Sequence, residues 1–89
     1  MARTLLLADE IVLPSLTGSA TSFTSATVVR LVNNNTSAAV VTVVETQGGA
    51  GIGSFTMPGN SVEYLEKQAS YCVFATGGNV LGAKVGFTG

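Results

Sequence analysis

The chain of 89 residues contains no histidine and no tryptophan, one cysteine, four basic residues and five acidic residues. General acid–base catalysis most often uses histidine, and a serine or cysteine nucleophile usually needs an adjacent base. The neighbouring carboxylates, Asp9 with Glu10 and Glu63 with Glu66, are spaced so that the two members point to opposite sides of an extended chain. We therefore expect no catalytic residues, and an enzyme acting through Glu63 or Glu66 ranks last among the alternatives.

The same scarcities argue against metals and cofactors. Zinc sites need Cys and His, and a calcium loop needs acidic residues concentrated within twelve positions. The glycine-rich segment 49–53 lacks the following helix and the Lys-Ser/Thr pair of a phosphate-binding loop, so we interpret it as a hinge or hairpin loop. No metal and no cofactor is expected. Cys72 cannot form an intramolecular disulfide and reads as a small core residue, which fits synthesis in a reducing cytoplasm.

Two classes of partner are also excluded by the composition. Binding to nucleic acid needs clustered Lys and Arg, whereas the basic residues Arg3, Arg30, Lys67 and Lys84 are dispersed along the chain. A transmembrane span needs about 18–20 consecutive apolar residues, and the longest apolar runs here are far shorter. The apolar run 5–8 is only four residues long and is ended by Asp9 and Glu10, which argues against a secretion signal. We expect neither nucleic acid nor a membrane as a partner.

The low charge itself points to an assembly. Only 10% of residues are charged, whereas soluble domains average about 25%. A small domain without disulfides or metals usually gains stability by association. We therefore expect a homo-oligomer or a subunit of a larger particle.

The strand pattern predicts an all-β single domain over residues 1–89. Residues 1–25 are expected to form an N-terminal arm or an edge strand plus a surface loop, and residues 26–89 the sandwich core. β-branched and aromatic residues recur in short runs separated by Gly, Asn, Pro and Ser. The predicted strands are 26–33, 38–45, 52–57, 62–66, 71–76 and 79–87. A helix over 61–68 is a minor alternative. The fold class is a small antiparallel β-sandwich or flattened barrel of six to seven strands with an extended N-terminal segment.

Three connections are predicted to be tight turns. Residues 34–37 should join strands 26–33 and 38–45 as a hairpin. The segment 57–60 has the type II pattern, with Pro58 at the second position and Gly59 at the third, where φ is positive. Gly77 and Gly78 should form a two-residue hairpin loop before the last strand.

The candidate inter-subunit contacts are apolar residues that a domain this small, with a single core, is not expected to bury. Strand 38–45 is apolar on both faces, so a second chain could cover one of them. The N-terminal apolar clusters are equally compatible with a first sandwich strand and with an arm that docks on a neighbour. The candidates are Leu5, Leu6, Leu7, Ile11, Val12, Leu13, Val40 and Val44. The six aromatic residues alternate with aliphatic ones and are interpreted as core, rather than as a stacking platform for sugars.

The alternation over 26–45, the segment GSFTMPGNSVEYLEK (53–67) and the ending GAKVGFTG (82–89) resemble the small β-rich virion structural proteins of tailed bacteriophages, particularly cyanophages. The resemblance covers roughly residues 26–89 and is one of segment order. It implies a non-enzymatic virion protein, made in the host cytoplasm. The role it implies first is a capsid decoration or cement protein that binds the major capsid protein or other virion subunits. A neck or tail component is the alternative in the same class, and a small adhesive or glycan-binding β-module is the alternative from another class.

Overall fold

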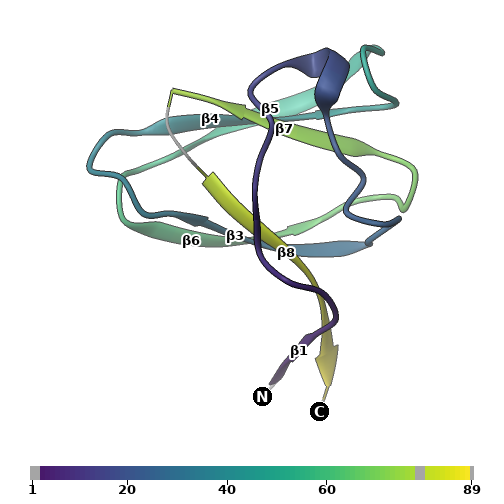
Figure 1. The fold of residues 1–89 in the computed structure, drawn as a ribbon, viewed down its shortest axis with the longest axis vertical. Helices are drawn as coiled ribbons and strands as arrows, with labels where there is room; N and C mark the ends of the chain where they lie inside the picture. Colours follow the sequence, from purple (N-terminus) through teal and green to yellow (C-terminus); the bar gives the residue numbers. More distant parts are fainter. Residues whose placement is uncertain (1–2, 78–79, 89) are drawn as a thin grey trace.

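The computed structural model describes residues 3–77 and 80–88 and consists of two antiparallel sheets packed face to face (Figure 1). The larger sheet contains β1 (Arg3–Leu6), β2 (Ile11–Val12), β3 (Val28–Asn33), β6 (Ser61–Glu66) and β8 (Val80–Thr88). The smaller sheet contains β4 (Ala39–Val44), β5 (Gly51–Met57) and β7 (Cys72–Thr76), and a short 3-10 turn, η1, spans Thr17–Ser19. The all-β sandwich is therefore confirmed, and the flattened closed barrel is not formed. Residues 61–66 form a strand, not a helix.

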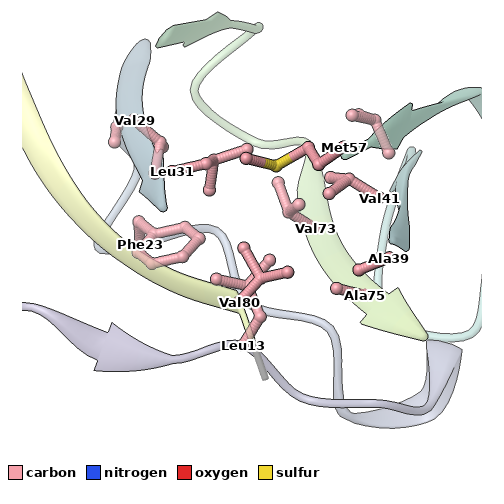
Figure 2. Close-up of a cluster of buried hydrophobic side chains, with 12 residues drawn as sticks. Leu13, Phe23, Val29, Leu31, Ala39, Val41, Met57, Val73, Ala75 and Val80 are labelled. Atoms are coloured by element: carbon pink, nitrogen blue, oxygen red, sulfur yellow. The ribbon is translucent and has the colours of Figure 1, made fainter. Parts of the chain in front are cut away.

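The strand order is β1-β8-β3-β6 in the larger sheet, with β2 also on β8, and β5-β4-β7 in the smaller sheet. The alternating burial of β3 is what the period of two in its sequence predicts, because Val29 and Leu31 face inward while their neighbours are half-buried. Between the sheets these side chains pack with Val41, Met57 and Val73 (Figure 2). The core is continuous across the two sheets.

Two predicted hairpins are wrong, because the strands they would join lie in different sheets. β3 pairs with β6 and β8, whereas β4 pairs with β5 and β7. The connection 34–38 therefore crosses from one sheet to the other. The same holds between β7 and β8, where Gly77 has a φ of 92° and Gly78 lies outside the described residues. The glycine segment 49–53 is a hairpin loop only in its first part, because Gly49 and Ala50 lie in the connection between β4 and β5, whereas residues 51–53 begin β5. The same connection contains Gly48, which has a φ of 70°.

Asn33 supplies the physical reason for the crossing after β3. Its side chain is fully buried, and its amide nitrogen donates to the carbonyl oxygens of Ser37 (3.0 Å), Met57 (3.1 Å) and Pro58 (3.3 Å). Its side-chain oxygen, Oδ1, accepts a hydrogen bond from the backbone N–H of Asn35 at 3.1 Å. These bonds join the end of β3 to the end of β5 and so fix the corner between the sheets.

The turn at 57–60 is also not the predicted type II turn. Positive φ falls on Asn60 (58°) and not on Gly59. Gly59 is needed for a different reason, because a Cβ at this position would collide with the backbone carbonyl of Thr36. The turn connects β5 in one sheet with β6 in the other.

Residues 3–25 contribute more to the core than the expected arm and loop. The segment runs from β1 across one side of the sandwich to the smaller sheet (Figure 1). On the way, the N–H of Ala75 donates to Pro14 O (2.9 Å), and Thr21 exchanges two backbone hydrogen bonds with Val73. Ala20 and Phe23 are buried, in a stretch that composition alone marks as surface.

Candidate interaction surfaces

The first candidate surface is the terminal ribbon, formed by β1 with Leu7 and the end of β8 (residues 84–88). β1 pairs with β8 from Arg3 opposite Thr88 to Leu6 opposite Val85, and the N–H of Leu7 donates to Lys84 O at 3.0 Å. The ribbon projects from the sandwich and carries both ends of the chain (Figure 1). Leu5, Leu6 and Leu7 are 49%, 65% and 50% exposed. Strand alternation places Leu5 and Leu7 on one side of the ribbon and Leu6 on the other.

Ile11 and Val12 form β2 on the edge of the sandwich, opposite Gly82 and Leu81 of β8. They are 45% and 55% exposed. Like the leucines of the ribbon, they are exposed apolar residues of the N-terminal segment, and the exposed Asp9 and Glu10 lie between the two groups along the chain. Five of the eight candidate contact residues therefore lie exposed in one part of the chain.

Two candidates lie in the interior of the subunit and offer no surface to a partner. Leu13 is buried in the main core, and Val44 is buried against Ala20 and Cys72 on the outer side of the smaller sheet. We expected a second chain to cover one face of strand 38–45. At the Val44 end of this strand, the outer face is instead covered by Ala20 of the same chain. A register shift between Val43 and Val44 accompanies the burial of both side chains. Val40 alone among the candidates on β4 remains exposed, at 40%.

The opposite side of the sandwich carries the second candidate surface, the β5–β6 groove. It has a volume of about 260 Å³ and runs between the last strands of the two sheets. Its walls include Ile52, Gly53 and Phe55 of β5, Leu65 at the end of β6, and Tyr71. Ile52 is 49% exposed. The groove is largely apolar, and its one acidic wall residue is Glu66.

Lys67 is a feature that the sequence analysis missed. Its side chain is 7% exposed, and its ammonium nitrogen donates to four backbone carbonyls, those of Ala26 (2.7 Å), Ser22 (3.0 Å), Gln68 (3.3 Å) and Ala69 (3.4 Å). Burial lowers the pKa of Lys67 below 10.5 because desolvation penalises the charged form, Cys72 opposes this shift, and Lys84 adds to it. A single lysine after a strand gives no sequence signal for such a cage.

The carbonyl cage is built on an unusual turn. Phe23, Thr24 and Ser25 all have positive φ (55°, 56° and 57°), and the N–H of Ala26 donates to Ser22 O at 3.1 Å. This left-handed turn directs Phe23 into the core, while Lys84 donates to Thr24 O at 3.0 Å. Non-glycine residues rarely adopt this conformation in succession. Lys67 and Lys84 bind its carbonyls and so hold it together.

The carboxylates do not form a paired site. Glu63 and Glu66 are both exposed on β6, and three positions along a strand place them on opposite sides. Glu10 forms an ion pair with Arg30 at 3.5 Å, with both side chains more than a third exposed, an arrangement that contributes little to stability. Within residues 3–77 and 80–88, no group of three or more His, Cys, Asp and Glu side chains could hold a metal ion. The described part of the chain also has no helix long and apolar enough to cross a membrane.

The aromatic rings are mostly enclosed. Phe23 is buried, and Phe55, Tyr71 and Phe74 are half-buried against the two core clusters. Tyr64 is exposed at 45%. The described rings therefore do not form an exposed row.

Comparison with known proteins gives no match at the level of a family model, a curated sequence or a solved structure. The class that the fold defines is a small antiparallel β-sandwich with exposed apolar surfaces at its terminal ribbon and along one open side.

Proposed function

We propose that this chain is a non-enzymatic structural subunit of a phage virion, a capsid decoration or cement protein that binds the major capsid protein. The single observation that carries the proposal is the exposed apolar surface along the N-terminal segment. Its side chains are Leu5, Leu6, Leu7, Ile11, Val12 and Leu16, each between 45% and 67% exposed.

Exposed large apolar side chains gathered along one segment favour a site that another protein covers, because large exposed apolar patches are uncommon on monomers. Only 10% of the residues of the chain are charged, so charge repulsion does little to prevent its association with other proteins. The resemblance of residues 26–89 to virion proteins of tailed phages supports a shell as the partner. A neck or tail component would use the same surface, and it remains the second candidate in this class.

A glycan-binding module is less well supported. Such modules stack sugars on exposed rings. Among the aromatic side chains that the structure describes, only that of Tyr64 is exposed. An enzyme is supported least, because Glu63 and Glu66 lie on opposite sides of β6.

The test is binding to purified phage shells that lack decoration, with isolated necks and tails as separate samples. We expect saturable uptake onto the shells, measured by co-sedimentation. Ile11→Ser/Val12→Ser should reduce this uptake at least tenfold. Val62→Ser is the matched control, since Val62 is 46% exposed but lies on β6. Uptake by necks or tails alone would move the assignment to those structures, and no uptake by any of the three would overturn the proposal.

A further inference from the structure

The edges of the two sheets are protected unequally. On one side, β2 pairs with β8, and Pro14 and Thr21 bind the edge of β7. On the open side, β6 carries Glu63 and Glu66, and charges on an edge strand discourage pairing with other chains. β5 has neither form of protection. Its sequence, GIGSFTM, has no charge and no proline, and no described strand pairs with its outer edge.

The glycines of β5 are not explained by the subunit itself. A Cβ at Gly51 or Gly53 would have no neighbour within 4 Å, and neither residue has a positive φ. Gly59 and Gly82, in contrast, are each in close contact with other atoms of the chain. Glycine within a strand often marks a place where another backbone approaches closely. The free space beside Gly53 opens into the β5–β6 groove.

The same chain carries a strand with complementary features. The four residues of β1 and the following Leu7 form an extended run, and within the described residues β1 pairs with β8 alone. Leu5 and Leu7 are half exposed on one side of this run. A two-stranded ribbon is marginally stable without further packing. The ribbon therefore has an unpaired edge and an uncovered apolar side.

We propose that β1 of one copy adds to β5 of a second copy as a fourth strand of the smaller sheet, with Leu5 and Leu7 seated in the β5–β6 groove. This inference rests on the proposed role as an assembly subunit and names the contact between its copies. The groove, at about 260 Å³, is below the roughly 300–1,000 Å³ of small-molecule sites, and it suits side chains that arrive two positions apart on a strand. β5 carries no charge, and residues 4–8 of the donor segment carry none; the charges nearest the contact are Arg3 at the start of β1 and Glu66 in the groove wall.

The geometry of this contact determines how it assembles. Donor strand and acceptor edge are different surfaces, so the contact is head-to-tail and continues into a ring or a chain of copies. A strand of this length contributes far fewer residues than the about 20–30 per side of a standard stable interface. We therefore expect weak, concentration-dependent association of free copies, which strengthens when a shell holds them close together.

The test compares the masses of three variants with that of the wild type by sedimentation equilibrium up to millimolar concentration. Gly53→Val fills the part of the groove beside the acceptor edge where Leu5 and Leu7 would lie, and Leu5→Ser/Leu7→Ser removes the donor side chains. Leu6→Ser is the matched control on the other side of the same strand. We expect Gly53→Val and the double variant to associate at least tenfold more weakly than the wild type, and Leu6→Ser to associate like the wild type. Because a Cβ at position 53 has no neighbour within 4 Å and φ there is not positive, the melting temperature of Gly53→Val should be equal to or above that of the wild type, which separates filling of the groove from misfolding.

Mixing the variants identifies the direction of the contact. Gly53→Val retains a donor strand and the double leucine variant retains an acceptor edge, so an equimolar mixture should form a one-to-one dimer that neither forms alone. A wild type that stays monomeric, a Gly53→Val variant that associates normally, or a mixture that stays monomeric would overturn the inference. None of these results bears on uptake by shells, so failure here is distinguishable from failure of the proposed function.

Discussion

The ammonium nitrogen of Lys67 lies 2.7 Å from the carbonyl oxygen of Ala26, and three further backbone carbonyls complete its set of acceptors. The contact joins the residue after β6 to the residue that closes the left-handed turn before β3. A buried ammonium is tolerated when hydrogen bonds replace its hydration. Lys67 thus fixes two segments that are 41 positions apart in the sequence.

Replacing Lys67 by methionine should destabilise the fold by about 2–4 kcal/mol, because the buried carbonyl of Ala26 loses its side-chain donor and three part-buried carbonyls lose theirs. Lys84→Met is the matched control, since Lys84 makes one exposed hydrogen bond to Thr24 O. It should cost less than about 1 kcal/mol. Urea denaturation monitored by circular dichroism measures both changes. Equal losses in the two variants would show that the cage adds nothing beyond a surface contact.

The lowered pKa of Lys67 predicts a specific pH dependence. Between the folded-state pKa and 10.5 the unfolded chain binds more protons than the folded one, so the free energy of unfolding contributed by Lys67 rises with pH in this window. Below the window both states are protonated and the contribution is constant. The difference in unfolding free energy between wild type and Lys67→Met, measured from neutral pH to pH 10.5, should therefore increase. A difference that falls with pH would mean that the cage raises the pKa.

Asn33→Asp should be strongly destabilising at neutral pH, by about 3 kcal/mol or more. The substitution removes the donor to Ser37, Met57 and Pro58 and places a buried carboxylate against their carbonyl oxygens. Asn34→Asp, at the exposed neighbouring position, is the control and should change stability by about 0.5 kcal/mol or less. Thermal unfolding at neutral and at acid pH provides the check. The loss should shrink in acid, where the carboxyl is protonated and can donate a hydrogen bond.

The positions of the strands were predictable because β-branched and aromatic runs alternate with turn residues, as in 26–33 and 38–45. The assignment of each strand to one of the two sheets was not predictable from the sequence. The crossing after 26–33 depends on the hydrogen bonds of the buried Asn33 side chain, and the turn residues 34–37 suit a hairpin and a crossing equally well. Phe23 illustrates the same limit, because only its left-handed backbone brings a residue from a polar stretch into the core.

For the candidate surfaces, short apolar runs were sufficient to identify the exposed leucines of the ribbon. They could not separate these from Leu13 and Val44, whose burial depends on the path of the N-terminal segment over the sandwich. The β5–β6 groove had no sequence signal either, because it forms between two strands that do not pair.

Gly82 should be intolerant of alanine. A Cβ at this position would lie 2.6 Å from Cζ of Phe23 and 2.8 Å from Cδ1 of Leu13, both in the core. Overpacking of this kind costs about 1–3 kcal/mol. Gly51→Ala is the matched control, and since its Cβ meets open space it should stabilise the strand by up to about 1 kcal/mol. Chemical denaturation of both variants tests the pair, and a neutral Gly82→Ala would show that Phe23 can move aside.

Thr24→Gly should stabilise the protein by about 0.5 kcal/mol. Thr24 is exposed and β-branched and has a φ of 56°, a conformation that costs an L-residue roughly 1–2 kcal/mol and glycine almost nothing. Part of the gain is offset because glycine gives the unfolded chain more freedom. The hydrogen bond from Lys84 survives, since its acceptor is the backbone carbonyl. Thr27→Gly, at an exposed position without positive φ, should instead destabilise. The melting temperature should therefore rise for Thr24→Gly and fall for Thr27→Gly. Opposite shifts distinguish relief of backbone strain from a general effect of glycine. A fall in both would mean that the turn stores no strain at Thr24.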